Sequence, residues 1–288
     1  MVFLFDDFLT TLVYLLIGLA LFIVGKVAYQ IFHPSIKVRH ELVEADNFAF
    51  TVSYVGYFIG LLLAIGSAVM GETNAPLIED IIDTLIYGFL AIVLMNLSIL
   101  INDKLILPKF KVKKEIIEDK NIGTGVIEGA MCIATGLIIL GAIHGESFGS
   151  GSPILIALVF WGLGQALLFI TSKIYNLITP YDVHDHIERD NVAVGIGFAG
   201  AIIAIANLIR FAIMHDFEDW ISSIEDIAFD VTIGFILLPV ARWFADKILL
   251  PGRKLTDEIV NQEHPNNGAA LIEAFAYIGG SMLITWAL

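Results

Sequence analysis

The run IGTGVIEGAMCIATGLIILGAI, residues 122–143, decides the fold of this chain. Glu128 is its single charged side chain. As an α-helix the run would be about 33 Å long, enough to cross the roughly 30 Å hydrocarbon core of a bilayer. Lipid offers no hydrogen-bond partners, so a spanning backbone must satisfy its own groups as a helix. The run therefore predicts a transmembrane helix.

Similar runs lie on both sides of it. The predicted spans are 8–32, 47–70, 81–107, 122–143, 153–178, 191–214, 224–250 and 267–287. They are solidly apolar, whereas an outer-membrane barrel would alternate apolar and polar residues. Asp6 and Asp7 stand where a signal peptide would carry positive charge, so we expect the first run to be an uncleaved span. The predicted fold class is an all-α membrane protein with eight transmembrane helices.

The composition excludes several other classes of protein. Hydrophobic residues make up 57% of the chain, against roughly 45–50% in soluble domains. Charged residues make up 16%, against roughly 25% in soluble domains. The net charge of -14 would repel phosphate and excludes a nucleic-acid partner. The single cysteine, Cys132, excludes a disulfide scaffold. The expected environment is the lipid bilayer.

The basic residues predict the orientation. All 16 lysines and arginines except Arg210 lie in the loops between spans 1–2, 3–4, 5–6 and 7–8, or at the helix ends beside them. By the positive-inside rule these loops are cytoplasmic, which places both termini outside a bacterial inner membrane. The opposite side is rich in acids. Either this acidic face concentrates cations, or acids are simply tolerated where bases are excluded.

The two halves of the chain repeat each other at an offset of about 145 residues. His40 through Asp46-Asn47 recurs as His184 through Asp190-Asn191. Other matched groups are Leu21-Phe22-Ile23 with Leu168-Phe169-Ile170, Asp103-Lys104 with Asp246-Lys247, and Asn121, Gly123 and Glu128 with Asn266, Gly268 and Glu273. We predict two four-helix repeats, residues 1–145 and 146–288. Four spans per repeat make the repeats parallel, related by a pseudo-two-fold axis along the membrane normal.

The block from His40 to Asn47, followed by a span with Gly56 and Gly60, resembles the bacterial membrane family called domain of unknown function 350. The block from His184 to Asn191 resembles it again, so the resemblance covers the whole chain as two copies. It implies a membrane-stress or polyamine context, and it defines no catalytic residues. Relatives with a single copy would need to dimerise to form the same pair of four-helix repeats, so a homo-oligomer is a further expectation.

Glu128 and Glu273 are the strongest candidates for a functional site. Each lies about seven residues after an asparagine, Asn121 or Asn266, that begins its span. Ionisable residues inside a membrane are costly and point to function or to a buried partner. Lys26 and Lys173 lie at a similar depth, so we expect the pairs Lys26–Glu128 and Lys173–Glu273. Such pairs would either bind and exchange protons or cations, or fix helix register as permanent ion pairs.

Two further groups of polar residues flank the spans on the same side. Asp46-Asn47 and Asp190-Asn191 stand where spans begin, which suits N-caps. The alternative is that they form a cytoplasmic mouth to the glutamate site. The stretch Lys109-Phe-Lys-Val-Lys-Lys114 is basic and amphipathic. We expect its lysines, Lys109, Lys111, Lys113 and Lys114, to contact anionic headgroups, or alternatively a cytoplasmic protein.

No catalytic, metal-binding or cofactor-binding signature appears in a suitable context, so the sequence predicts neither an enzyme nor a cofactor. Two functions are the main alternatives, with an intramembrane enzyme or lipid-handling protein as a third. The chain is either a channel or transporter for monovalent cations, protons or polyamines that uses the paired glutamates, or a non-transporting envelope module that docks cytoplasmic partners through its basic loops.

Overall fold

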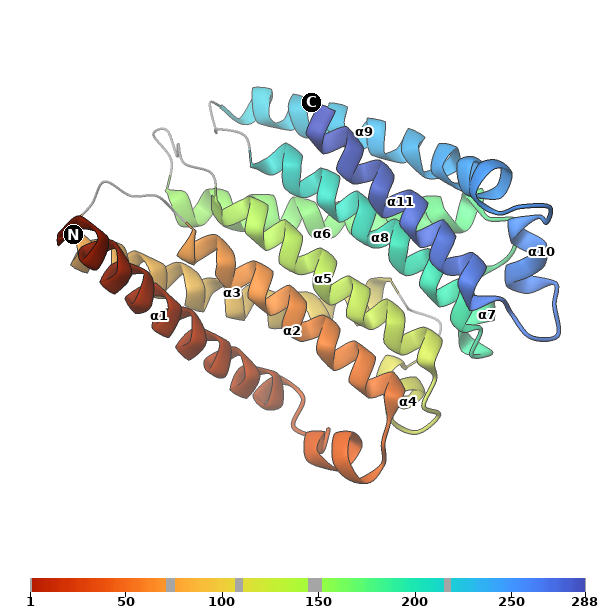
Figure 1. Ribbon diagram of the computed structural model, residues 1–288, viewed down its shortest axis with the longest axis horizontal. Coiled ribbons are helices and arrows are strands. Elements are labelled where there is room, and N and C mark those ends of the chain that lie inside the picture. Colours follow the sequence, from red (N-terminus) through yellow and green to blue (C-terminus); the bar gives the residue numbers. More distant parts are fainter. Residues whose placement is uncertain (1, 71–75, 107–110, 145–151, 215–218, 288) are drawn as a thin grey trace.

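The computed structural model describes residues 2–70, 76–106, 111–144, 152–214 and 219–287, with side chains from Phe8 onward. The described residues are almost entirely helical (Figure 1). The long helices are α1 (Val2–Phe32), α2 (Phe48–Val69), α3 (Leu77–Leu105), α5 (Ile122–His144), α6 (Pro153–Ile178), α8 (Val192–Ile213), α9 (Trp220–Phe244) and α11 (Asn267–Ala287). The short ones are η1 (His40–Glu44), α4 (Val112–Ile117), α7 (Val183–Glu188), η2 (Ala245–Leu249) and α10 (Leu255–Val260).

The long helices form two rows. Helices α2, α5, α8 and α11 lie side by side in that order, and we call them the core row (Figure 1). Helices α1, α3, α6 and α9 pack over one face of the core row and form the outer row. Helices η1, α4, α7 and α10 gather at one end of the bundle, which we call the short-helix end. The chain is thus four consecutive units, each with an outer helix, a short helix and a core helix.

Small residues bring the core helices together. Gly56 and Gly60 of α2 face Gly129 and Gly136 of α5 so closely that a Cβ on either α2 glycine would overlap the α5 backbone. Without side chains between them, the two backbones gain close van der Waals contact, the main attraction between helices in lipid. The outer helices instead carry large apolar side chains, and α1 is mostly exposed, as suits contact with lipid tails.

The predicted spans agree with the observed helices to within a few residues. Seven long helices are apolar enough to cross a membrane: α1, α2, α3, α5, α6, α8 and α11. The eighth, α9, occupies the position in its unit that α3 occupies but is not among these seven; it carries Glu225, Asp226, Asp230 and Arg242. The prediction of eight spans is therefore confirmed for seven. The predicted orientation and pseudo-two-fold axis stay predictions, and the predicted repeat boundary at residues 145–146 lies outside the described residues.

Candidate functional site: two buried glutamate centres

In the first repeat, Glu128 meets a second acid. Glu128 lies on the second turn of α5 and Asp103 near the end of α3, and their carboxyl groups are within hydrogen-bonding range of each other. Glu128 is only 6% exposed. Within the described chain, Asp103 Oδ1 and Glu128 Oε2 have no hydrogen-bond donor. Two ionised carboxylates in contact repel strongly in a low-dielectric environment, so this contact requires a shared proton or a bound cation.

A small cavity of about 40 Å³ adjoins this acid pair. Its walls include Tyr29, His33 and Lys113, so it lies toward the short-helix end. A space of this size accepts water or a single dehydrated monovalent ion. Burial lowers the pKa of His33, although its ring also hydrogen-bonds to the Tyr29 carbonyl oxygen at 3.0 Å. Burial thus disfavours the charged imidazole, which makes His33 a poor source of the positive charge that the acid pair needs.

In the second repeat, Glu273 has its own cation. The Arg242 guanidinium of α9 forms an ion pair with Glu273 Oε1, and the Tyr277 hydroxyl donates to the same oxygen at 2.9 Å. Glu273 is fully buried, with a relative exposure of 0%. A buried carboxylate is tolerated when a hydrogen-bonded opposite charge accompanies it. The charge of Glu273 is thus balanced within the chain.

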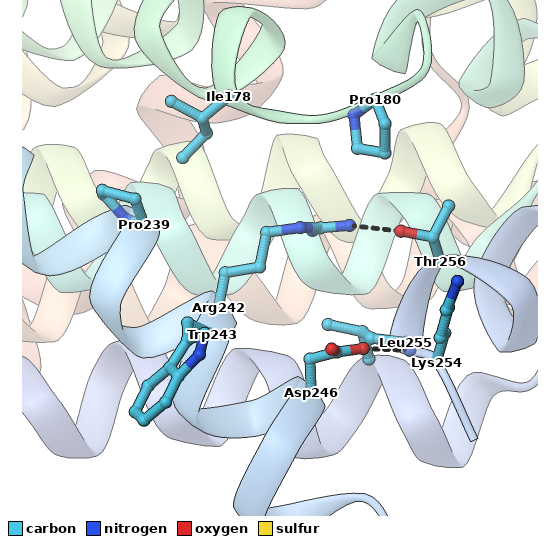
Figure 2. A pocket seen from close by; sticks show the side chains of 9 residues that line it. All are labelled: Ile178, Pro180, Pro239, Arg242, Trp243, Asp246, Lys254, Leu255 and Thr256. Atoms are coloured by element: carbon cyan, nitrogen blue, oxygen red, sulfur yellow. Dashed lines mark hydrogen bonds between the residues drawn. The ribbon is translucent and has the colours of Figure 1, made fainter.

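The other arginine nitrogens face a larger cavity of about 380 Å³ at the short-helix end (Figure 2). Arg242 Nη2 donates to Thr256 Oγ1 at 3.3 Å across it. Asp246, which aligns with Asp103, accepts from the Leu255 backbone N–H at 2.6 Å and from Lys247 Nζ at 2.7 Å. Although burial alone would raise the pKa of Asp246, these hydrogen bonds lower it. Asp246 is therefore ionised and engaged elsewhere, so the second repeat has no counterpart of the Asp103–Glu128 contact.

The predicted lysine–glutamate pairs are wrong. The side chains of Lys26 and Lys173 are exposed on the outer row, and Lys173 Nζ lies 5.1 Å from the centre of the Phe169 ring. Long flexible lysines on these helices reach outward, because the ammonium group is more stable near water than between helices. The partner of Glu128 is Asp103 and the partner of Glu273 is Arg242.

The four predicted helix-start asparagines are placed in equivalent ways. The side-chain Oδ1 of each caps its own core helix, accepting from the backbone N–H three residues later at 2.8–3.1 Å. The first three also donate from Nδ2 to a carbonyl oxygen of the next unit's short helix: Asn47 to Ile116, Asn121 to Ile187, and Asn191 to Ile259. These three are buried, whereas Asn266, at the end of the core row, is exposed. The first three asparagines are thus structural links between units, and a part for any of the four in a cation or proton site stays a prediction.

The two aspartates before these asparagines behave differently from the expected N-caps. Asp190 does not cap its own helix: its Oδ1 accepts from the backbone N–H groups of Ile122 and Gly123 at 3.0 and 3.4 Å, at the start of the neighbouring helix α5. Both Asp46 and Asp190 have a left-handed backbone, with φ of 45° and 56°. In Asp190 this conformation accompanies a carboxylate that hydrogen-bonds to the preceding unit rather than to its own helix.

The asparagine links give a direct stability prediction. Asn121→Ala should lower the free energy of unfolding by about 2–4 kcal/mol, because it removes a helix cap and leaves the buried Glu115 carboxylate and the Ile187 carbonyl with one donor fewer. Asn266→Ala, the matched control, should cost less, about 1 kcal/mol. It also removes a cap and a bond to the Glu258 carboxylate, but Asn266 is exposed and, within the described residues, donates to no neighbouring unit. Reversible unfolding in mixed micelles measures both values. Equal losses would contradict the role of the asparagines as links.

The basic stretch forms the amphipathic helix α4. Val112, Glu115 and Ile116 are buried, while Lys111, Lys113 and Lys114 are exposed. Lys113 Nζ donates to Ser35 Oγ at 2.7 Å, and Lys114 pairs with Asp119 at 2.9 Å. Lys109 lies outside the described residues. Contact of these lysines with anionic headgroups or with a cytoplasmic protein stays a prediction.

Sequence reasoning did not identify Asp103 as part of a site. Its signal was present, because Asp103 is an acid near the end of a predicted span and recurs as Asp246. The lysine at similar depth was preferred, since opposite charges were assumed to pair. Which side of α3 faces α5 depends on tertiary packing, so the acid–acid contact could not be read from spacing alone.

Comparisons with known proteins agree with the tandem organisation. Residues 3–143 and 149–288 each match a family described as Domain of Unknown Function (DUF350). A UPF0719 transmembrane protein of Aquifex aeolicus (strain VF5) is 24% identical over 204 residues, covering 70% of this chain and 72% of that protein. The UPF0719 transmembrane protein YshE of Bacillus subtilis (strain 168) is 28% identical over 118 residues, covering 41% of this chain and 80% of that protein. No solved structure matches the chain.

Proposed function

Since this chain belongs to the DUF350 family, in two tandem copies, and is a multi-pass membrane protein, we propose that it transports protons or monovalent cations through the first repeat. The proposal rests on the Asp103–Glu128 contact. This buried pair of acids needs one positive charge. Within the described residues Asp103 Oδ1 and Glu128 Oε2 have no hydrogen-bond donor, and Lys113, which lines the same cavity, donates to Ser35 Oγ instead. A proton or a small cation from solution fills that place.

The second repeat supports this assignment by contrast. There the equivalent glutamate, Glu273, holds the Arg242 guanidinium, a cation that cannot leave. In the second centre the arginine side chain therefore occupies the position that an exchangeable cation would take in the first. A fixed cation stabilises the fold, whereas an exchangeable one can be transported. The asymmetry assigns the exchange to Glu128 and a structural role to Glu273.

Buried polar groups continue from the acid pair toward the middle of the bundle. Asn102 Nδ2 lies 3.4 Å from Thr135 Oγ1, between α3 and α5. One to two turns further along α3, Ser98 Oγ accepts from Trp161 of α6 at 2.8 Å. One turn along α6 from Trp161, back toward the short-helix end, Gln165 is buried, and both its amide atoms lack a hydrogen-bond partner in the described part of the chain. Unsatisfied polar atoms between helices suit a route for water or ions.

The proposed setting is an inner membrane, with the short-helix end in the cytoplasm. The positive-inside rule supports this orientation. The small cavity beside Glu128 then opens toward the cytoplasm, and the acidic loops face the other side. A docking role for the basic loops is the alternative, and it has no comparable buried site to support it.

The test is flux through liposomes that contain the purified protein. The wild type should dissipate a gradient of protons, Na⁺ or K⁺, and Glu128→Gln should reduce the rate to that of protein-free liposomes, because an amide cannot exchange a proton or balance a cation. Glu44→Gln, at a surface acid that is 57% exposed, is the matched control and should leave the rate unchanged. Full activity of Glu128→Gln, or no wild-type flux with protons, Na⁺, K⁺ or polyamines, would overturn the proposal.

A further inference from the structure

The core row ends at α11 on one side and at α2 on the other, and both ends carry the polar groups that join units inside the chain. The contact between α5 and α8, which joins the two repeats, shows how such groups connect two units inside the chain. There Asp190 caps the start of α5, and Asn121 Nδ2 donates to the Ile187 carbonyl at 2.7 Å. Backbone contact is close, since a Cβ on Gly195 would lie 2.8 Å from the Gly123 carbonyl oxygen.

Both halves of this junction recur at the ends of the row. At an offset of about 145 residues, Asn266-Asn267-Gly268 repeats Asn121-Ile122-Gly123, and at an offset of 144 residues Asp46 repeats Asp190. Asn266, Asn267 and Gly268 are all exposed, as is Asp46. Asp46 keeps the left-handed backbone that aims Asp190 at its neighbour. In the described chain no hydrogen bond to the Asp46 carboxylate is formed. Each end of the core row thus carries one of the two sets of groups that form the α5–α8 junction.

The apolar faces beside these polar groups correspond as well. Ala130 of α5 and Ala199 of α8 line one groove that runs along α2, α5 and α8 and that Val55 of α2 also lines. Their counterparts are Phe275 of α11 and Val55 of α2, which are 66% and 48% exposed. Exposed apolar side chains also suit lipid, so the apolar faces alone decide nothing. The polar groups favour an interface, because Asp46 and the start of α11 carry the complementary donor and acceptor groups that join α8 to α5 inside the chain.

We propose that the core row continues into a second copy of this chain, with α11 of one copy packed against α2 of the next and Asp46 capping α11. The interface is head-to-tail, so repeating it gives a closed ring when the rotation closes. The relative YshE fits this arrangement: its match covers most of that protein but under half of this chain. The α5–α8 junction inside this chain would then form between two molecules of that relative.

The first test is cross-linking of the full-length protein in native membranes, with Cys132→Ser as the background. Two single-cysteine variants, Val55→Cys and Phe275→Cys, carry different affinity tags and are expressed together. A head-to-tail interface should give a cross-linked heterodimer bearing both tags, and neither variant alone should form one. As the matched control, Phe89→Cys, at a 59% exposed position on the outer row, should not cross-link to Phe275→Cys.

Cross-linking of either single variant to itself would overturn the proposal in favour of a face-to-face dimer, and no cross-link in any combination would overturn assembly at these faces. The second test is particle mass in lipid nanodiscs. Asp46→Ala combined with Asn266→Ala should shift the oligomer–monomer equilibrium toward monomer by about tenfold. Asp119→Ala, at an exposed acid away from these faces, should not. Both readouts are independent of ion flux.

Discussion

Arg242→Gln should destabilise the protein by about 3–5 kcal/mol, because it leaves the Glu273 carboxylate buried without its cation. The double variant Arg242→Gln/Glu273→Gln should recover most of this loss, since two amides can hydrogen-bond to each other without charge. Equilibrium unfolding in mixed micelles of the wild type, both single variants and the double variant gives the interaction energy of the pair.

The pH dependence of the unfolding free energy gives a second measurement on Arg242→Gln. Acid protonates the unpaired Glu273 and removes its buried charge, so the stability deficit of Arg242→Gln should shrink as the pH falls. Glu128→Gln is the matched control, because it removes a charge that has no cation within the chain; its stability should equal or exceed that of the wild type at neutral pH. Two results would contradict the assigned difference between the two centres. One is a large loss of unfolding free energy in Glu128→Gln. The other is additive losses from the Arg242 and Glu273 substitutions in the double variant.

Gly60→Leu should prevent stable folding, with a cost of about 3 kcal/mol or more. A side chain at Gly60 would overlap the Cys132 carbonyl of α5 and the Met95 side chain, and a backbone carbonyl cannot move aside as a flexible side chain can. The expected result is a large loss of monodisperse protein after detergent extraction, together with a lower unfolding midpoint.

The matched control lies on the same helix. Gly66 has open space around the position of a Cβ, with nothing within 4 Å. Gly66→Leu makes the same change in helix propensity and hydrophobicity, so it should leave extraction and the unfolding midpoint close to those of the wild type. Similar damage from both substitutions would mean that propensity, rather than close packing of α2 on α5, sets the requirement for glycine.

Much of the architecture was predictable because a bilayer allows few solutions. The observed ends of α2, α5, α6, α8 and α11 lie within a residue or two of the predicted spans. The prediction did less well for α9, because acids near its start and Arg242 near its end interrupt the apolar pattern. The short helices could not be predicted, because a segment of five or six residues is too short to show a clear helical periodicity.

The candidate site was predictable only in part. Glu128 and Glu273 were identified by a property that sequence displays, an acid inside an apolar run. Their partners were not, because several charged residues lie at a similar depth and sequence gives no distance between helices. Neither Asp103, the partner of Glu128, nor Arg242, the partner of Glu273, could be selected from spacing along the chain.

The helices, the tandem repeat and the two acids inside apolar runs follow from the sequence, since length, hydropathy and periodicity act locally along each helix. Three features follow from helix packing instead: the core helices stand in one row, Glu128 meets an acid while Glu273 meets an arginine, and the row is left open at Asp46 and Asn266. The physical reason is that helix packing selects one face of each helix. A rotation of one residue, about 100°, exchanges a buried partner for lipid.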